Sequence, residues 1–409
     1  MMNTYAFLRD RRQRWLLACS VPADLADWLD YVAILSLLVF VWGEGPLVLA
    51  GFAICLAAPY ALIGPWLAVW VDRDEPGRAM LLANLGRAAT TALILVASNV
   101  VAVLAIVLLR SAVDSLFAPA RQAMIQRITS DADLGTVNGL HHAINQTAKV
   151  VGPGLGGLLL AVMPFNWVIG TNAILSLLAA LACLPLAGRQ ALPSLQTKDE
   201  QGGGIIEGFA VFTRDRLLLL ALLFAAGAFF AFFLYDSQLA LVAVLFGLGQ
   251  EGFALSVASS GAGGVVGALL AGRLAGQRPM PVMILAAVVS GLTTMAVSVW
   301  AMLGLPMGLA PFLLILAAMG GTTAMMMVPF RVLMQRRVPQ AVMARASATS
   351  EAVITAVMLA APLLGGAISA QWGVAVAMCL GGTLVVLLAL ATLGGLRFAG
   401  ERSSGRVSA

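Results

Sequence analysis

The sequence predicts an all-α membrane protein with twelve transmembrane helices in two parallel six-helix halves. The prediction rests on composition, on the length of the apolar stretches and on an internal repeat. Of the 409 residues, 61% are hydrophobic and 11% are charged, and the mean hydropathy is +0.96. A soluble domain carries about 25% charged residues, so this composition indicates a polytopic membrane protein.

Apolar stretches of membrane-spanning length fill most of the chain. A helix needs about 20 apolar residues to cross the hydrocarbon core of a bilayer, and twelve stretches bounded by turn or charge signals meet this length. Their expected bounds are 15–41, 46–71, 79–98, 100–118, 137–163, 167–187, 216–246, 253–275, 282–303, 309–334, 342–370 and 373–396.

Positive charges occur on one side of this predicted topology. Arginine and lysine residues precede the first span, follow or end the even-numbered spans, and recur in the tail after the last span. Cytoplasmic connectors are enriched in these residues. The pattern therefore predicts a multi-pass protein of the cell inner membrane with both termini in the cytoplasm. It attributes the net charge of +5 to topology rather than to nucleic-acid binding.

The two expected halves, 1–187 and 216–409, resemble each other at a shift of 209 or 210 residues. Pro119, Arg121 and Arg127 align with Pro329, Arg331 and Arg337; Pro153, Gly156 and Gly157 align with Pro362, Gly365 and Gly366; Asp27 aligns with Asp236. The segment 188–215 contains three consecutive glycines beside charged residues, which indicates a flexible cytoplasmic linker. Because both halves have the same predicted orientation, we expect parallel repeats about an axis along the membrane normal.

A glycine-rich motif lies in the fifth predicted span. Gly152-Pro153-Gly-Leu-Gly156-Gly157 resembles the Gly-Pro-x-x-Gly-Gly signature of the major facilitator superfamily, which is characteristic of its antiporters. Physically, the glycines let a neighbouring helix approach closely, and the proline permits a bend. Ordinary packing of small residues accounts for the motif, whereas a role in blocking proton leak is implied by the resemblance.

A second motif lies between the second and third spans. Asp72-Arg73 followed by Gly77-Arg78 resembles another signature of this superfamily, although Ala68 stands where glycine is usual and two extra residues precede Gly77. These charges can form a cytoplasmic ion-pair cluster that holds one conformation of a transporter. A solvated turn is the alternative interpretation.

Further residues extend the resemblance over nearly the whole chain. Arg110 lies in the fourth span, where the superfamily often has a membrane arginine, and the stretch 117–125 is similar to the branch that contains the enterobactin exporter and macrolide-efflux proteins. The resemblance implies the major facilitator fold and transport by alternating access.

Acidic residues inside the first span are candidates for proton or substrate-cation binding. Asp24, Asp27 and Asp30 fan over about 120° of a helix, so all three can face one cavity. Carboxylates close together cannot all ionise cheaply, so at least one is expected to carry a proton. Asp27, with its repeat partner Asp236, is the preferred candidate. Pairing with a nearby arginine, or a shorter and wetter span, are the alternatives.

Other charges inside the predicted spans are also candidate site residues, since charged groups in hydrocarbon are costly. Arg110 and Asp114 are four residues apart and can pair on one helix face, either as a structural pair or as a switch in which Asp27 or Asp114 competes for Arg110. Lys149 and Glu351 either contact substrate or pair charges between helices. Arg87 can reach the cytoplasmic surface by snorkelling, so we expect a structural role for it.

The sequence favours transport over catalysis. It contains no Gly-x-x-x-x-Gly-Lys-Ser/Thr motif for nucleotide hydrolysis and no zinc-type spacing of histidine and cysteine. We therefore expect a monomeric secondary active transporter without a cofactor or metal, which uses the proton gradient to export a small amphipathic drug, siderophore or metabolite across the lipid bilayer. The alternatives are a lysophospholipid-type flippase or importer, and a transport-dead membrane receptor or scaffold.

Overall fold

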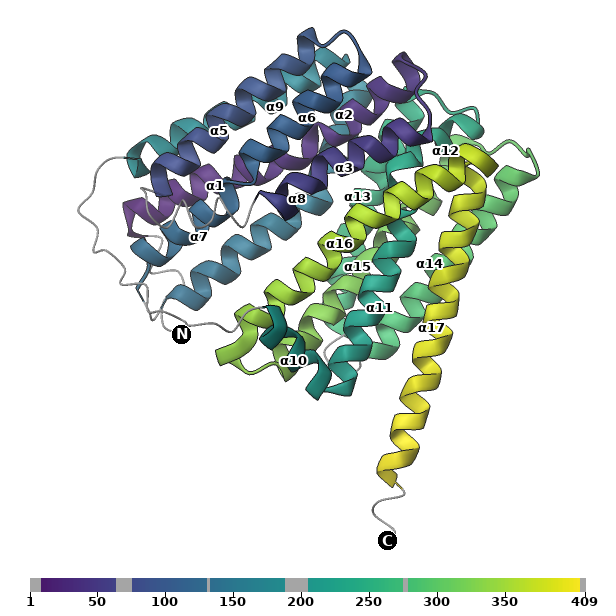
Figure 1. Ribbon diagram of the computed structural model, residues 1–409. Coiled ribbons are helices and arrows are strands. Elements are labelled where there is room, and N and C mark those ends of the chain that lie inside the picture. The colour runs from purple at the N-terminus through teal and green to yellow at the C-terminus, as the bar shows by residue number, and fades with distance from the viewer. Residues whose placement is uncertain (1–8, 64–75, 131–132, 188–204, 275–278, 405–409) are drawn as a thin grey trace. The chain divides into compact units, whose positions relative to one another are not determined.

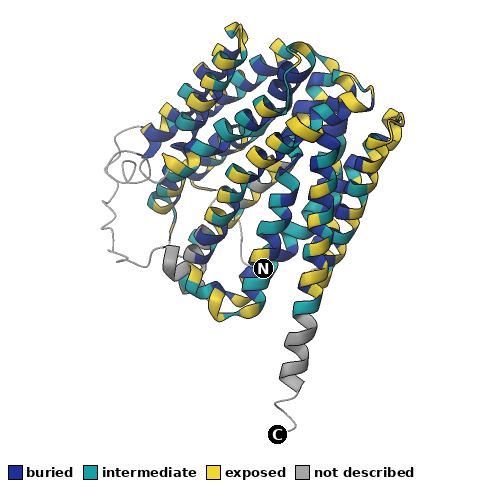
Figure 2. Cartoon of the chain, turned by 45° about the vertical axis from the view of Figure 1, so that its right-hand side comes forward, coloured by how far each residue is buried: buried dark blue, intermediate teal, exposed yellow. Residues whose placement is uncertain are grey.

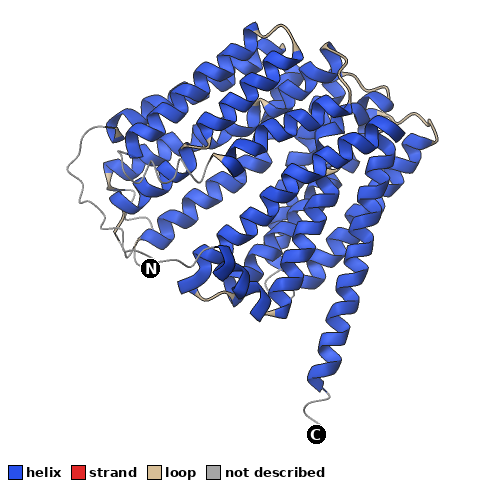
Figure 3. Cartoon of the chain, viewed as in Figure 1, coloured by secondary structure: helices blue, strands red, loops and turns tan. Residues whose placement is uncertain are grey.

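The computed structural model describes residues 9–63, 76–130, 133–187, 205–274 and 279–404. Within these ranges the secondary structure is helical and contains no strand, as Figure 3 shows. The chain forms two compact units. Unit 1 comprises Met1–Glu44, Gly51–Asp199 and Phe253–Ala258, and unit 2 comprises Gly45–Ala50, Glu200–Gly252 and Ser259–Ala409.

Unit 1 is organised around its first helix, α1 (Arg11–Leu29), which packs against α8 (Leu134–Val162) and α9 (Phe165–Cys183) (Figure 1). Helix α5 (Pro76–Leu93) packs on α9 and on α6 (Val100–Asp114). The other helices are α2 (Tyr31–Ser36), η2 (Leu37–Val41), most of α3 (Pro46–Leu62), η3 (Ile94–Val96), α7 (Phe117–Ile128) and η4 (Leu184–Leu186). The contacts of α1 place Asp24, Asp27 and the C-cap residue Asp30 inside this unit.

Unit 2 contains two sets of packed helices. Helix α14 (Pro279–Met302) lies against α15 (Leu309–Arg337) and α17 (Val374–Ser404), and α11 (Arg216–Phe233) lies against α16 (Gln340–Trp372) and α17. The remaining helices are α10 (Ile205–Arg214), η5 (Asp236–Gln238), α12 (Leu239–Leu245) and most of α13 (Gln250–Leu274).

The helices follow the predicted spans closely. Within the described ranges, nine stretches are long and apolar enough to cross a membrane, and Pro46–Leu62 is a shorter apolar helix. Two other predicted spans, 15–41 and 137–163, are also helical, in α1 to η2 and in α8. Both contain charged or polar side chains that lower their hydropathy. A count of twelve membrane spans stays a prediction.

Large apolar side chains are exposed along the helices and not only buried between them. Figure 2 shows exposed positions recurring over the length of the long helices, and Leu109, Leu178 and Leu314 are among the exposed leucines. Soluble proteins rarely expose apolar surface on this scale, whereas a surface in contact with lipid is apolar by necessity. The exposed surface therefore suits a bilayer.

Part of the predicted linker is helical. Residues 188–204 lie outside the described ranges, but Ile205–Arg214 forms α10. This corrects the expectation of a flexible linker over the whole of 188–215. The helix packs against α16 and buries the ring of Phe212 completely, because apolar residues recur on one of its faces.

Asp215 defines the start of α11. Its carboxylate accepts hydrogen bonds from the backbone N–H groups of Leu217 (2.9 Å) and Leu218 (3.3 Å) and pairs with Arg337 at 2.9 Å. Burial alone would raise the pKa of Asp215, but the bonds from Arg337, Leu218 and Leu217 outweigh it and lower that pKa below its ordinary value. A cap of this kind satisfies helix donors that have no partner within the helix.

Candidate functional site

Asp24 and Asp27 of α1 and Asp30, which caps its C-terminal end, each bind an arginine from a different helix. Asp24 accepts two hydrogen bonds from Arg121 of α7, at 2.7 and 2.9 Å. Asp27 pairs with Arg87 of α5, and the Asp30 carboxylate lies 3.3 Å from Arg110 of α6. The spacing of three residues therefore directs the carboxyl groups to three different neighbours. The expectation that all three face a single cavity is corrected: Asp24 and Asp30 are each 1% exposed, and Asp27 is 19% exposed.

Arg87 lies at the centre of this network. Its Nη1 atom donates to Asp27 and, at 2.9 Å, to Asp114, while Nη2 donates to the Asn84 side chain. The guanidinium is fully buried, so the prediction that Arg87 reaches the cytoplasmic surface by snorkelling is wrong. The close approach of α5 and α6 is permitted by Gly86, where a Cβ atom would lie 2.5 Å from Val113.

Arg110 and Asp114 have different partners from those expected. Arg110 pairs with Asp30, donates from Nη2 to the Ala26 carbonyl at 3.0 Å, and donates from Nε to Thr91 at 3.2 Å. Asp114 pairs with Arg87 instead. The predicted pair on one face of the fourth span is thus replaced by two pairs between helices. Sequence spacing identified both residues as functional candidates but assigned them the wrong partners.

Tyr60 of α3 completes the environment of Asp114. Its hydroxyl donates to Asp114 Oδ2, while 42% of the residue surface is exposed. Sequence analysis did not single out Tyr60, because a lone tyrosine in an apolar span carries no charge signal. A buried or partly buried hydroxyl beside a carboxyl group usually marks a hydrogen bond, but the partner is decided by tertiary packing.

Phe117 connects the two arginines of neighbouring helices. Its ring centroid lies 5.7 Å from Arg87 Cζ and 5.2 Å from Arg121 Cζ. Cations at this distance are attracted to the face of an aromatic ring. Asn145 of α8 adds a hydrogen bond of 3.0 Å to Asp24. The network therefore joins α1, α3, α5, α6, α7 and α8 within unit 1.

The glycine motif packs α8 closely against α1. A Cβ atom at Gly156 would lie 2.1 Å from the Leu29 carbonyl oxygen, and one at Gly152 would lie 2.7 Å from Trp28 Cβ. In the repeat, a Cβ atom at Gly365 would lie 1.8 Å from the Leu234 carbonyl oxygen. The packing interpretation of the motif is therefore sufficient in both units. The other members of these motifs, Pro153, Gly157, Pro362 and Gly366, lie inside the helices α8 and α16.

The motif between the second and third spans is described only in part. Asp72 and Arg73 lie outside the described residues. Gly77 lies in the first turn of α5, where a Cβ atom would be 2.0 Å from the Leu186 carbonyl oxygen, and Arg78 is exposed beside it. Gly77 is therefore required for the contact between α5 and the end of η4.

The remaining candidate residues lie on other elements of the two units. Glu351, with 52% of its side chain exposed, pairs with Arg331 at 3.4 Å in unit 2. Asp236 is half-buried in η5, at the break between α11 and α12, and Lys149 is exposed on α8. Arg121 and its repeat partner Arg331 thus each bind an acid of their own unit.

Two cysteines that are far apart in the sequence lie side by side in the fold. Cys19 of α1 and Cys183 of α9 are buried, and their sulfur atoms lie 2.7 Å apart. The Asn84 amide is 3.7 Å from each sulfur. Among the residues that the structure describes, no group of three or more His, Cys, Asp or Glu side chains could hold a metal ion.

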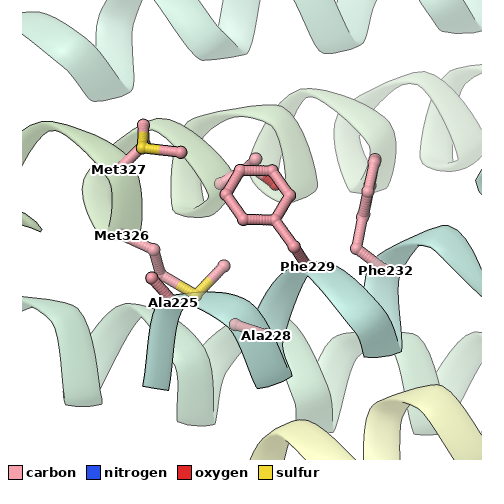
Figure 4. Close-up of a pocket in the computed structure, with 7 residues that line it drawn as sticks. Ala225, Ala228, Phe229, Phe232, Met326 and Met327 are labelled. Atoms are coloured by element: carbon pink, nitrogen blue, oxygen red, sulfur yellow. The ribbon is translucent and has the colours of Figure 1, made fainter. Parts of the chain in front are cut away.

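Unit 2 contains a small apolar pocket between α11 and α15. Figure 4 shows Phe229 and Phe232 of α11 together with Met326 and Met327 of α15. Ala225, Ala228 and Thr323 complete the lining, and the Thr323 hydroxyl donates to the Met319 carbonyl at 2.9 Å. Aromatic rings and thioethers line this pocket, so its surface is apolar.

Comparison with known proteins places this fold in a family. The sequence model of the Major Facilitator Superfamily matches residues 25–350. The chain belongs to this superfamily. As a major facilitator protein it is a membrane transporter and not an enzyme. The match confirms the predicted family and the helical membrane fold.

Relatives of this major facilitator protein are found among bacterial transporters. An uncharacterized MFS-type transporter, YfiS of Bacillus subtilis (strain 168), is 27% identical over 392 residues, which cover 95% of this chain and 94% of that protein. The staphyloferrin A transporter of Staphylococcus aureus (strain NCTC 8325 / PS 47) is 22% identical over 179 residues, or 42% of this chain and 45% of that protein. The predicted branch around the enterobactin exporter stays a prediction.

Solved structures share the fold. An auto-inhibited peptide transporter of the POT family has a TM-score of 0.68 at 16% identity and covers 95% of this chain and 97% of that one. A mutant of the nucleoside transporter NupG has a TM-score of 0.66 at 14% identity, and the match covers 93% of this chain and 99% of that one. At these identities the likeness concerns the fold alone.

Proposed function

We propose that this major facilitator protein is a proton-coupled exporter of a small amphipathic molecule. The observation that carries the proposal is Asp27, the most exposed carboxyl group of a buried ion-pair network. Charged groups inside a membrane are costly and usually functional. A partly exposed carboxyl on a buried guanidinium can exchange a proton with solvent while its surroundings stay dry.

Two further observations support the amphipathic substrate and the direction of transport. The pocket of Phe229, Phe232, Met326 and Met327 offers an apolar surface without charged side chains among its lining residues. The Gly152 to Gly157 motif resembles the antiporter signature, and antiport of protons drives export.

The test begins with the purified protein and a thermal-stabilisation screen of amphipathic drugs and siderophores. The strongest stabilising compound then serves as the probe in everted vesicles, with its uptake and the accompanying proton flux recorded together. We expect Asp27→Asn to abolish substrate-driven proton flux, because an amide cannot carry the proton. Asp215→Asn is the matched control, since Asp215 caps a helix outside the network. Unchanged coupling in Asp27→Asn would remove Asp27 as the carrier, and probe flux independent of the proton gradient would contradict the proposal.

A further inference from the structure

Asp27 and Asp114 accept hydrogen bonds from the same nitrogen atom of Arg87. Arg87 Nη1 donates to a carboxyl oxygen of each, from α1 and α6 respectively. The two carboxyl groups therefore lie within a few ångströms of each other in a region where Arg87 is fully buried and Asp114 is 3% exposed. Two carboxylates so close in a low-dielectric site resist ionising together and titrate as a pair.

The charges of the surrounding network do not balance. In the ion pairs around Arg87 and Arg110, three carboxyl groups, of Asp27, Asp30 and Asp114, bind these two guanidinium groups. Asp24 and Arg121, which join the network through Phe117, balance each other and leave this count unchanged. One proton on the three carboxyl groups makes the network neutral, and an uncompensated charge in such a site is strongly unfavourable.

The neighbours of the pair decide where that proton resides. The charged and titratable groups that act on it include Asp24 of α1, Asp30 at the end of α1, Tyr60 of α3, Arg87 of α5 and Arg110 of α6. Arg121 of α7 and Lys149 of α8 lie on the other two helices that carry charges and pack against α1. Tyr60 donates its hydroxyl to Asp114, and a donated hydrogen bond favours the ionised form of a carboxyl group. Asp27 is 19% exposed, against 3% for Asp114, so it has the better access to exchangeable protons.

We infer that Asp27 and Asp114 share a single proton across Arg87, and that Tyr60 is the positioning residue that directs this proton to Asp27. Deprotonation leaves two carboxylates on one guanidinium. The repulsion between them destabilises this arrangement of unit 1 and favours a rearrangement. The inference rests on the proposed function for the use of the proton, but the location of the proton is independent of transport.

Infrared difference spectroscopy on the purified full-length protein tests the shared proton. At neutral pH we expect one band of a protonated carboxyl group from this network. The band should disappear in Asp27→Asn and also in Asp114→Asn, because either change leaves two carboxylates on two guanidinium groups. It should persist in Asp215→Asn, which is outside the network. A band that survives in either network variant would overturn the shared proton.

The pH titration of the same band tests Tyr60. Its hydroxyl stabilises the ionised pair, so in Tyr60→Phe the pair should keep its proton to higher pH, with a midpoint raised by about one unit. Tyr235→Phe is the matched control, because it removes a buried hydroxyl that lies 3.4 Å from the neutral side chain of Thr294 in unit 2. Equal midpoints in Tyr60→Phe and the unmodified protein would overturn the role of Tyr60.

The two proposals fail in different ways. If the band behaves as expected but vesicles show no proton flux with the stabilising probe, the proton pair stands and the exporter proposal fails. If proton flux is coupled to probe flux but the band persists in Asp114→Asn, the exporter proposal stands and the shared proton is overturned.

Discussion

At the scale of single residues, the buried charges of unit 1 are the features that packing alone does not explain. Arg87 has no exposed side-chain surface and holds two carboxyl groups and an asparagine. An apolar side chain would avoid the cost of transferring these groups from water. Their presence therefore indicates a use for the charges, and the exchange of a proton is the use we propose.

Removal of Arg87 is predicted to destabilise the protein strongly. Arg87→Ala leaves Asp27 and Asp114 without their cation, and breaking a buried pair costs about 3–5 kcal/mol. Arg337→Ala removes an arginine that is 46% exposed and paired with Asp215, and an exposed pair contributes about 0–1 kcal/mol. Thermal unfolding of both variants in detergent, followed by tryptophan fluorescence, measures the difference. Equal losses of stability would contradict a buried ionic network.

At the scale of helices, small residues decide which helices can approach each other. Gly156 and Gly365 both face the backbone of the first long helix of their own unit, at Leu29 and Leu234. The two contacts lie near the ends of α1 and α11, where the helix is interrupted next to Asp30 and Asp236. The same local arrangement thus recurs in both units.

A methyl group at Gly156 is predicted to separate α8 from α1. Its Cβ atom would lie 2.1 Å from the Leu29 carbonyl oxygen, so the helices must shift, and overpacking of this kind costs about 1–3 kcal/mol. Gly170→Ala is the control, because no atom lies within 4 Å of the added Cβ in α9. That change should stabilise the helix by about 0.5–1 kcal/mol. Thermal unfolding of both variants gives the sign of each effect, and destabilisation by Gly170→Ala alone would contradict the packing.

At the scale of the whole molecule, the two units share two features, a buried apolar core and an arginine that is paired with an acid. Each unit contains its own buried core, with Phe117 and Met124 in one and Phe224 and Phe330 in the other. The paired arginines Arg121 and Arg331 each bind an acid of their own unit. The repeat seen in the sequence therefore has a counterpart in side-chain contacts.

The membrane orientation is predicted from the arginine distribution and can be tested directly. A green fluorescent protein fused after residue 396 should fluoresce, because the C-terminus is expected in the cytoplasm. Alkaline phosphatase inserted at Gly304, in the turn between α14 and α15, should be active, because this connector is expected in the periplasm. Reversed activities of the two reporters would contradict the predicted topology.

The sequence by itself determined the class of protein, the approximate bounds of the helices and the superfamily. These follow from local properties, since the length of an apolar stretch and the spacing of glycines do not depend on distant contacts. It also identified Asp27, Arg110 and Asp114 as candidates, because charges in apolar stretches are visible without a fold.

The partners of those charges were decided by the tertiary structure alone. Arg87 was expected at the surface and is buried, and Tyr60 carried no signal in the sequence, yet both contact Asp114. The pairing of Asp30 with Arg110 of α6 likewise joins residues that are far apart in the chain. Ion pairs inside unit 1 form between helices that are far apart in the chain. The sequence therefore shows which residues are charged but not which residues they bind.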